Sequence, residues 1–443
     1  MRPTLPLLSL IALLSGCAAT PQPGRYLLDP HTGSAGSETV EVALDLERHA
    51  DNDWSAALVN GDERIPVPVV RRVTSGFTLE FPHYDSRLDL EFDLEFKEWA
   101  IEGTWTKERG KENPAVIAVT GKPIIDPDIS RSAPIHVETQ LNDRTTGRYA
   151  IDFSDSDPGV LELTVNRDGT ATATVLTPTG DYRYLIGRLE PRIPRRDPES
   201  RYRPDPRPPA ELYLSTFDGA HMFALTGELD ERGIIRGFFY SGDWWVEAYT
   251  ATPDPDAALP NAFQESSWND TPLDTLVYTD LDGNPVSVAD LIRQAHADNP
   301  DAGPDGFGPT LIKVFGSWCP NCHDAAAYMA ELDAAYRARG LRIVGLAFEL
   351  TDDQQRSATQ VRRYLDRHDI DWPVLVAGVS DKSRASEAFP ALDRVRAYPT
   401  TIFLNANAEP IAVHTGFSGP ATGQAHQDLR HEYETLIETL LTN

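Results

Sequence analysis

The stretch Trp318-Cys319-Pro320-Asn321-Cys322 decides how the C-terminal part of this 443-residue chain folds. It follows the apolar run 311–315 and opens a helical pattern that reaches residue 339. A strand that leads directly into a helix, with Cys-x-x-Cys at the junction, places the first sulfur at the helix N-terminus. Backbone N–H groups without helical partners and the helix dipole favour a thiolate there. The pattern therefore predicts a nucleophilic Cys319 and, one turn inside the helix, a Cys322 that can close a disulfide with it.

The residues around this motif alternate between strand and helix patterns. An Asp-Gly turn at 282–283 indicates an entry hairpin, and further apolar runs indicate buried strands. This alternation predicts an α/β sheet with helices on both faces over residues 263–443. We expect helices at 288–296, 324–339, 352–368 and 424–441, and strands at 311–315, 342–348, 401–405 and 411–415.

Residues 24–252 carry a β pattern instead. Segments such as 40–46, 77–81 and 88–94 alternate apolar and polar residues, turn residues separate them, and no long helical period occurs. We therefore expect an N-terminal all-β region built as an antiparallel barrel or sandwich. Two small units, one for each half, and one larger barrel made of both halves fit the pattern equally well.

Short motifs recur between the two halves of this β region. Gly24-Arg25-Tyr26 returns as Gly147-Arg148-Tyr149, and Ile101-Glu102-Gly103 returns as Ile235-Arg236-Gly237. These pairs indicate an internal duplication, with the shared turn chemistry of β-meanders as the alternative explanation. The repeats would span residues 24–125 and 146–252.

Proline-rich segments mark the boundaries of these regions. Thr252-Pro253-Asp254-Pro255-Asp256 indicates a linker over 253–262, ahead of the α/β part. The arginine-rich stretch 191–209 resembles a basic patch, but its prolines predict an extended, solvated loop. Trp244 and Trp245 are expected in the core or at a barrel rim, with the lining of a ligand cavity as the alternative.

The N-terminus resembles a bacterial lipoprotein signal peptide. Arg2 precedes a short apolar core, and Leu14-Ser15-Gly16 precedes Cys17. The apolar core is too short for a spanning helix. The resemblance implies a signal peptide at 1–16, a lipid on Cys17 and a lipidated tether at 17–23. Several acyl chains on one residue would anchor the protein stably to a membrane.

Such an anchor predicts a periplasmic, membrane-tethered protein, or one on the outer face of a Gram-positive cell. Ala18 stands where an aspartate would retain a Gram-negative lipoprotein at the inner membrane, so the outer membrane is favoured. Both locations are oxidising. Cys319 and Cys322 are the two cysteines besides Cys17, so we expect them to begin as a disulfide.

Composition and residue spacing exclude several other functions. The chain has 40 Lys+Arg against 68 Asp+Glu, and the net charge of −28 disfavours nucleic acid and anionic lipid surfaces as partners. A metal centre would need two ligands besides Cys319 and Cys322. His323, His368 and His414 have no recognised metal-binding spacing. We therefore expect neither a metal nor a cofactor.

Residues 263–443 resemble the TlpA/ResA-like branch of the thioredoxin-like proteins, which is related to the AhpC/TSA redoxins. The resemblance rests on the segments 316–322, 345–349, 398–404 and 414–420. Members of this branch are membrane-tethered thiol–disulfide oxidoreductases of the cell envelope. The resemblance thus implies a thioredoxin-like fold, client proteins that carry thiols or disulfides, and a membrane thiol electron donor or acceptor.

The same resemblance implies roles for individual residues. Cys319 would attack the client and Cys322 would resolve the mixed disulfide, so the two form a redox-active disulfide. Trp318 would shield one side of the pair. Pro399 would be a cis-proline that presents its flanking backbone to a client, and Glu349 would shuttle protons.

Two positions depart from the common pattern of the thioredoxins. Lys313 stands six residues before the first cysteine, where thioredoxins carry a buried carboxylate. A protonated lysine cannot accept a proton, and as a neighbouring cation it would lower a thiol pKa. Glu349 is then the nearest other carboxylate candidate, with a solvated acid paired with Lys313 or water as the alternative. His323 is expected on the helix surface.

Two alternative functions remain open at this stage. A thiol peroxidase of the peroxiredoxin type has a similar fold, but it needs a threonine three residues before its cysteine, where this chain has Gly316. A non-catalytic envelope binding lipoprotein would use Cys319 and Cys322 as a structural disulfide. Exchange of an exposed Cys319 with small thiols would distinguish these alternatives from an oxidoreductase.

Overall fold

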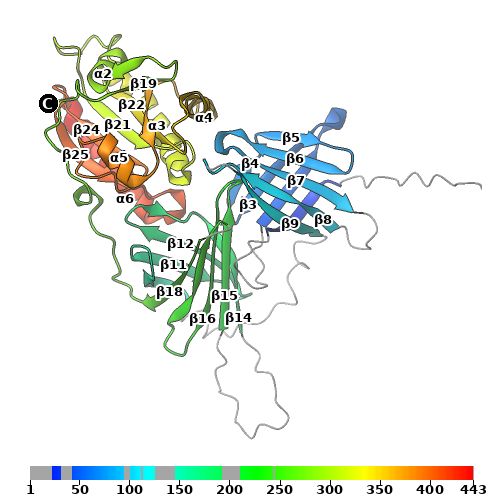
Figure 1. The fold of residues 1–443 in the computed structure, drawn as a ribbon. Coiled ribbons are helices and arrows are strands. Elements are labelled where there is room, and N and C mark those ends of the chain that lie inside the picture. Colours follow the sequence, from blue (N-terminus) through cyan, green and yellow to red (C-terminus); the bar gives the residue numbers. More distant parts are fainter. Residues whose placement is uncertain are drawn as a thin grey trace, which may run out of the picture.

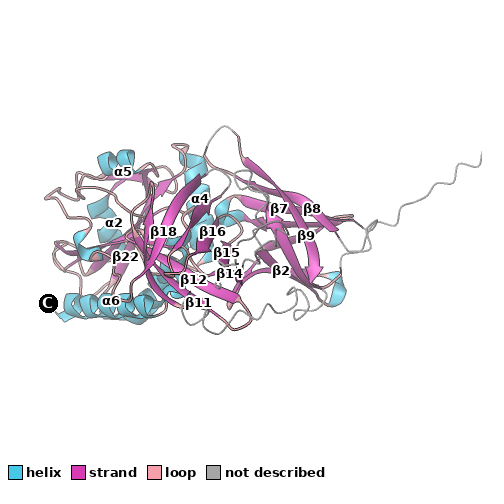
Figure 2. Ribbon diagram, turned by 90° about the horizontal axis from the view of Figure 1, so that it is seen from below, coloured by secondary structure: helices cyan, strands magenta, loops and turns pink. Residues whose placement is uncertain are grey.

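The structure, a computed structural model, describes residues 22–30, 42–93, 100–110, 113–124, 145–191, 210–242 and 245–442. It contains three β-sheets that follow one another along the chain. Figure 1 shows two all-strand units and a third unit in which helices cover a sheet. Figure 2 shows the long helices gathered around this third sheet. The predicted fold class, an all-β region followed by an α/β thioredoxin-like unit, is confirmed.

The first sheet is antiparallel and has nine strands in the order β4-β3-β2-β1-β9-β8-β7-β6-β5. Side chains alternate between core and surface along β1 and β2; in β1, Tyr26 and Leu28 are buried and Leu27 between them is partly exposed. The strands are β1 (Gly24–Pro30), β2 (Val42–Arg48), β3 (Trp54–Asn60), β4 (Glu63–Pro66), β5 (Val69–Arg72), β6 (Gly76–Phe81), β7 (Ser86–Asp93), β8 (Ala100–Lys107) and β9 (Ala115–Ile124).

The second sheet also has nine antiparallel strands, in the order β11-β10-β18-β17-β16-β15-β14-β12-β13. An additional pairing of β11 with β12 closes it on itself. The strands are β10 (Gly147–Phe153), β11 (Gly159–Val165), β12 (Thr170–Thr177), β13 (Gly180–Asp181), β14 (Leu185–Pro191), β15 (Ala210–Phe217), β16 (Met222–Leu229), β17 (Ile235–Ser241) and β18 (Trp245–Pro253).

The two β units have the same topology. When each strand of the first unit is matched to the strand nine places later, every neighbouring pair of the first sheet recurs in the second. Tyr26 and Tyr149 occupy matching places, and each donates a 2.6 Å hydrogen bond to the carbonyl four residues earlier. Both side chains are buried. These observations favour the predicted duplication and exclude one larger barrel, because each half forms its own sheet.

The third sheet is mixed and runs β20-β19-β23-β22-β21-β24-β25. Its strands are β19 (Val277–Asp280), β20 (Pro285–Ser287), β21 (Thr310–Phe315), β22 (Arg342–Glu349), β23 (Val374–Val379), β24 (Thr400–Leu404) and β25 (Pro410–Thr415). Its helices are α2 (Val288–Ala295), α3 (Pro320–Tyr336), α4 (Gln354–Arg367), α5 (Lys382–Ala388) and α6 (Gln424–Thr442). None of the helices in the described part of the chain is long and apolar enough to cross a membrane.

The helices of this unit begin where side chains can cap them. Ser287, Asp353 and Asp381 each accept a hydrogen bond from a backbone N–H in the first turn of α2, α4 and α5. The predicted helices and strands occur with small shifts at their ends. The sequence analysis did not predict β23 and α5, although the apolar run at 374–377 signals β23.

The hydrophobic cores follow the three units only in part. The core of the α/β unit consists of residues between 276 and 440 alone. The core of the first β unit also takes in residues of the second, such as Phe217, whose ring meets Trp105 at 4.9 Å. Ser86 Oγ donates a 2.6 Å hydrogen bond to the Gly219 carbonyl across the same interface. The two β units therefore pack through apolar contacts.

Some sequence predictions lie outside the described residues. These are the lipidated Cys17 with its signal peptide and tether, the arginine- and proline-rich residues 192–209, and Trp244. Trp245 lies in β18, is partly buried, and donates a 2.9 Å hydrogen bond from Nε1 to Glu247.

The separate core of the α/β unit generates a first prediction. A fragment of residues 263–443 should unfold in one cooperative thermal transition, because its buried apolar side chains come from within the fragment. Circular dichroism during heating measures this. A fragment that melts without a transition would show that the β units are needed for its fold.

Candidate functional site

Cys319 sits at the N-cap of α3, immediately after β21, as the sequence predicts. Its sulfur accepts a 3.3 Å hydrogen bond from the Cys322 N–H, and its S–H points to the Tyr398 carbonyl at 3.3 Å. Pro320 occupies the first turn, where its missing N–H costs nothing. Cys319 is 5% exposed and Cys322 is fully buried. Both are free thiols here, so the structure shows the reduced pair.

The loop before β24 lies against the cysteine pair. The Tyr398–Pro399 peptide bond is cis, as the family resemblance implied. The Trp318 indole donates a 2.9 Å hydrogen bond to the Phe348 carbonyl and meets the Tyr398 ring edge-on at 5.6 Å. Trp318 therefore forms a wall beside the pair, and the Tyr398 carbonyl faces the Cys319 sulfur.

Lys313 lies in β21 and is 1% exposed. Its ammonium donates hydrogen bonds to the Cys322 carbonyl at 3.0 Å and to the Tyr364 hydroxyl at 2.7 Å. Burial lowers the pKa of Lys313 to about 8, and the negative charge of the two sulfurs opposes this shift. Burial likewise raises the pKa of the Cys322 thiol, and Lys313 opposes that increase. A buried cation thus takes the place of the usual carboxylate.

Glu349 ends β22 and is 3% exposed. Its carboxylate accepts hydrogen bonds from the Ser317 N–H at 2.8 Å and from the Ser317 hydroxyl at 2.6 Å. The alternative of a solvated acid paired with Lys313 or water is therefore wrong. Burial raises the pKa of Glu349 to about 7, so the group can exchange a proton near neutral pH. Burial raises the pKa of Tyr364 and of Tyr398, and the negative charges of the cysteines and Glu349 raise both further.

The expectation that His323 lies on the helix surface is wrong. Its side chain is buried between α4 and the first β unit. Nε2 lies 2.8 Å from the Ser317 carbonyl, and Nδ1 lies 2.7 Å from His368 Nε2. The ring of Tyr84 contacts it at a centroid distance of 4.5 Å. Burial lowers the pKa of both histidines, which fits a neutral pair in which one ring donates to the other.

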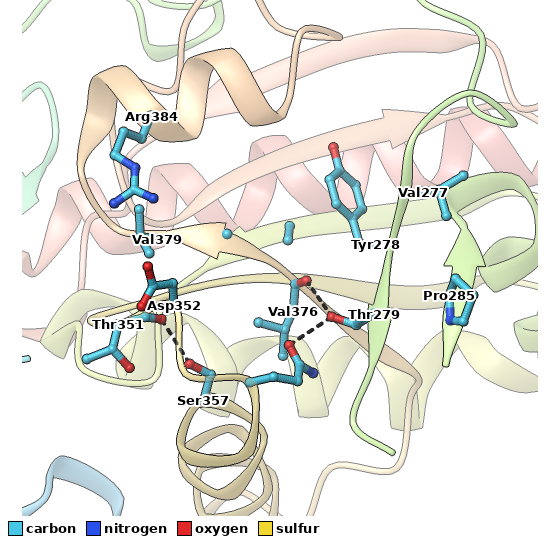
Figure 3. A pocket seen from close by; sticks show the side chains of 13 residues that line it. Val277, Tyr278, Thr279, Pro285, Thr351, Asp352, Ser357, Val376, Val379 and Arg384 are labelled. Atoms are coloured by element: carbon cyan, nitrogen blue, oxygen red, sulfur yellow. Dashed lines mark hydrogen bonds between the residues drawn. The ribbon is translucent and has the colours of Figure 1, made fainter. Parts of the chain in front are cut away.

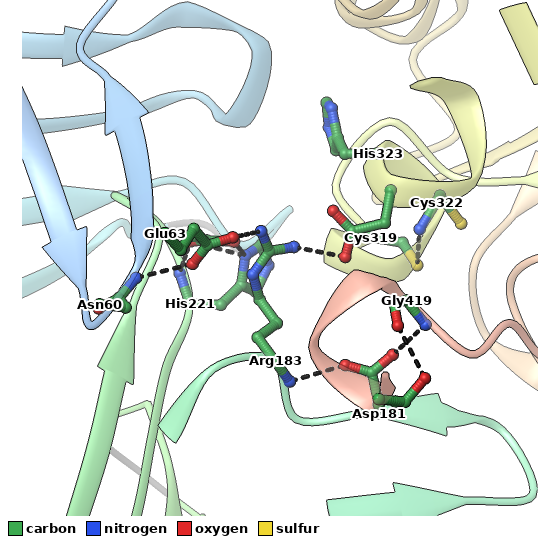
Figure 4. A network of polar contacts seen from close by, with 12 residues as sticks. Asn60, Glu63, Asp181, Arg183, His221, Cys319, Cys322, His323 and Gly419 are labelled. Atoms are coloured by element: carbon green, nitrogen blue, oxygen red, sulfur yellow. Dashed lines mark hydrogen bonds and ion pairs between the residues drawn. The ribbon is translucent and has the colours of Figure 1, made fainter. Parts of the chain in front are cut away.

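The β region reaches the cysteine motif, which the sequence analysis missed. Asn321 binds the backbone of Asp181 through both ends of its side-chain amide. The amide nitrogen donates to the Asp181 carbonyl at 3.1 Å, and the amide oxygen accepts from the Asp181 N–H at 2.9 Å. The Asp181 carboxylate accepts a 2.7 Å hydrogen bond from the Gly419 N–H. Figure 4 shows Asp181 and Gly419 beside Cys319 and Cys322. No local signal marks such contacts, because their partners lie more than a hundred residues apart in sequence.

Arg183 joins all three units at this place. Its guanidinium pairs with Asp324 of α3 at 2.9 Å and with Glu63 of β4 at 2.6 Å. Figure 4 shows the Arg183 guanidinium beside Glu63, with its ion pairs drawn as dashed lines. Burial raises the pKa of Asp324 to about 7 although Arg183 opposes this. The network therefore fixes the second turn of the motif helix to both β units.

A hollow away from the cysteines lies at the edge of the third sheet. It has a volume of about 370 Å³ and is lined by residues such as Tyr278, Asp352, Val379 and Arg384. Figure 3 shows β19, β23 and the start of α4 around it, and neither cysteine lines it. In the described part of the chain, no group of three or more His, Cys, Asp or Glu side chains is arranged to hold a metal ion.

Comparisons with known proteins agree with this geometry. No protein-family model matches the sequence. The chain is 25% identical over 141 residues to the thiol-disulfide oxidoreductase ResA of Halalkalibacterium halodurans, which covers 32% of this chain and 64% of that protein. It is 26% identical over 100 residues to ResA of Bacillus cereus, covering 23% of this chain and 46% of the relative. The chain thus matches less than two thirds of the length of these relatives.

Solved structures give similar matches. A thiol:disulfide interchange protein of the thioredoxin family from Chlorobium tepidum is 19% identical, with a TM-score of 0.26, over 37% of this chain and 92% of that one. A secreted disulfide oxidoreductase of Mycobacterium tuberculosis is 16% identical, with a TM-score of 0.23, over 34% of this chain and 91% of that one. By its strand order, its cysteine turn and its cis-proline, the C-terminal unit of this chain is thioredoxin-like.

Proposed function

We propose that this protein is a thiol–disulfide oxidoreductase that exchanges disulfides with clients through Cys319 and Cys322. The observation that carries the proposal is the position of Cys319. Its sulfur caps α3, accepts a backbone N–H, and faces the carbonyl before a cis-proline. The similarity to proteins named thiol-disulfide oxidoreductases supports the same chemistry.

The proposed reaction has two steps and balances without a cofactor. The Cys319 thiolate attacks one sulfur of a client disulfide, forms a mixed disulfide, and releases the other client sulfur as a thiolate. Cys322 then loses its proton and attacks the Cys319 sulfur, which releases the client's second thiol and leaves the Cys319–Cys322 disulfide. Two electrons pass to the client. A thiol donor must return them, and the reverse sequence oxidises a client dithiol.

The buried charges have separate roles in this proposal. Lys313 bonds to the backbone of Cys322, so its positive charge stabilises a thiolate in the pair. Stabilised thiolates favour the reduced form and make a pair more oxidising. Glu349, which titrates near neutral pH, is the proposed proton acceptor that prepares Cys322 for attack. Trp318 and Pro399 shape the entrance to Cys319.

The setting in the cell follows from the sequence resemblance. We propose a periplasmic protein held by lipid on Cys17, with the outer membrane favoured by Ala18. Its partners would be client proteins and a membrane thiol donor or acceptor. The formal net charge of −28 fits a protein that does not bind nucleic acid.

The peroxidase alternative is disfavoured by packing at Gly316. A side chain there would begin 2.3 Å from the Trp318 indole nitrogen and 2.8 Å from the Phe348 carbonyl. The threonine that a peroxidase needs three residues before its cysteine would therefore displace Trp318. The binding-lipoprotein alternative predicts that Cys319 does not exchange at all.

The central prediction concerns the two sulfurs. Cys319→Ser should abolish reduction of small disulfides, because the attacking sulfur is lost. Cys322→Ser should instead accumulate a mixed disulfide on Cys319, because nothing resolves it. Mass spectrometry of acid-quenched mixtures measures both. A mixed disulfide that accumulates on Cys322 in the Cys319→Ser variant would reverse the assignment.

A second prediction separates Glu349 from Lys313. Because a carboxylate accepts a proton only when ionised, resolution by Cys322 should accelerate as pH rises through about 7. Glu349→Gln keeps the contacts to Ser317 but should remove this rise and slow resolution by at least about tenfold. Lys313→Met should shift the equilibrium with glutathione towards the disulfide, because the reduced pair loses its cation.

Stopped-flow kinetics across pH and equilibration with glutathione measure these effects. Glu231→Gln, an exposed variant in the turn between β16 and β17, is the matched control for the glutamate change. Wild-type resolution in Glu349→Gln together with a large loss in Lys313→Met would make the lysine the proton acceptor instead.

A third prediction concerns the anchor. The mature protein should begin at Cys17, carry acyl chains, and fractionate with membranes. Mass spectrometry of the N-terminal peptide tests this. A mature terminus elsewhere, combined with release into the soluble fraction, would contradict the proposed location.

A further inference from the structure

The turn at residues 178–183, between β12 and β14, lies directly on the cysteine motif. Asn321, which stands between the two cysteines, makes both of its amide hydrogen bonds to the backbone of Asp181. A Cβ on the neighbouring Gly180 would lie 1.6 Å from the end of the Asn321 side-chain amide, so no space is left for a side chain between the two residues. The turn therefore occupies the surface beside the sulfurs as closely as packing permits.

The same turn also covers the loop that follows β25. The Asp181 carboxylate binds the Gly419 N–H at 2.7 Å. A Cβ on Gly416 would lie 2.9 Å from the Pro178 carbonyl, so the two backbones are in direct contact. Two of the loops that border Cys319 are thus engaged by the β region, whereas the Tyr398 carbonyl still faces the sulfur.

Buried charge holds the turn in this position. Arg183 is 7% exposed and pairs with Asp324 and Glu63. Its backbone is left-handed, with φ of 58°, a conformation that is unfavourable for a residue other than glycine. The Asp181 carboxylate offsets this cost by accepting the Arg183 N–H at 2.8 Å. Removing the Arg183 side chain would leave Asp324 and Glu63 without their cation.

The first β unit adds a second wall next to the motif. The rings of His83 and Tyr84 pack on His323, and Asp85 pairs with Arg356 of α4 at 2.7 Å. Attack on a disulfide requires the Cys319 sulfur to approach within bonding distance, about 2 Å, of a client sulfur. A folded protein, whose surface is broad, would collide with both walls before its disulfide reached a sulfur that is 5% exposed.

We propose that the 178–183 turn determines which disulfides this site accepts: it admits small disulfides and excludes those held in folded proteins. The inference rests on the thiol–disulfide exchange proposed above. Asp181 and Arg183 are then specificity-determining residues, and they act by holding the turn in place rather than by touching the reacting sulfurs.

The test compares two substrates of the reduced full-length protein. Stopped-flow measurements give the second-order rate constants for 5,5′-dithiobis(2-nitrobenzoate), a small disulfide, and for the disulfides of folded insulin. The ratio of the insulin constant to the small-disulfide constant is the readout. Two variants loosen the turn in different ways. Asp181→Ala/Arg183→Ala removes the bonds to Gly419 and Asp324. Gly180→Ala places a Cβ on the Asn321 amide, so either that amide or the turn must move and the contact between them is broken.

We expect both loosened variants to raise the ratio at least tenfold. Arg236→Ala, which breaks an exposed ion pair with Asp230 in the same β unit, should leave the ratio unchanged. Circular dichroism confirms that the variants are folded. Gly180→Ala removes no charge, so it provides the measurement if the double variant fails to fold.

Two results would overturn the inference. One is a wild-type protein that reduces insulin as rapidly as the small disulfide. The other is a folded Gly180→Ala variant with the wild-type ratio. A wild-type protein that reacts with neither substrate would instead contradict the thiol exchange itself, and the inference would fall with it.

Discussion

The buried guanidinium of Arg183 is the interaction on which the arrangement of this chain depends. It lies in the second β unit, pairs with Glu63 of the first, and pairs with Asp324 on the helix that carries both cysteines. A charge removed from water must be compensated by an opposite charge. The Arg183 guanidinium and the carboxylates of Glu63 and Asp324 can therefore stay buried only while the three units remain in contact. The apolar contact between the β units, through Trp105 and Phe217, adds to this constraint. The active-site surface is consequently a property of the whole chain, although the chemistry belongs to the C-terminal unit.

The C-terminal unit could be predicted from sequence because its information is local. Apolar runs predicted β21, β22, β24 and β25, and the cysteine motif after the apolar run placed Cys319 at the start of α3. The cis bond at Pro399 followed from the family resemblance. The β region was predicted as a class, and its two matching sheets agree with motifs that recur in sequence. Sequence could not choose between two barrels and one, because alternation fixes which face of a strand is buried but not which strand is its neighbour.

Prediction failed where burial depends on another unit. His323 was expected on a helix surface, and it would lie there if the first β unit did not cover it with His83 and Tyr84. Glu349, for which a solvated acid was the alternative, is instead buried within its own unit, where Ser317 donates to both of its oxygens. The contacts of Asp181 and Arg183 carried no sequence signal. In each case the partner is distant along the chain. Lys313 and Glu349 are both buried, and each has a chemical consequence. Lys313 places positive charge beside the sulfurs, and Glu349 holds a proton that it can release near neutral pH.

The proposed function requires a reversible dithiol–disulfide couple at Cys319 and Cys322. The most direct test is the reduction potential of that pair in the full-length protein. Equilibration in glutathione buffers of graded ratio, followed by acid quenching, alkylation and mass spectrometry, measures the oxidised fraction. The account predicts one reversible two-electron transition between the free thiols seen here and a single intramolecular disulfide. A pair that forms no intramolecular disulfide at any ratio, or only a stable adduct with glutathione, would contradict it.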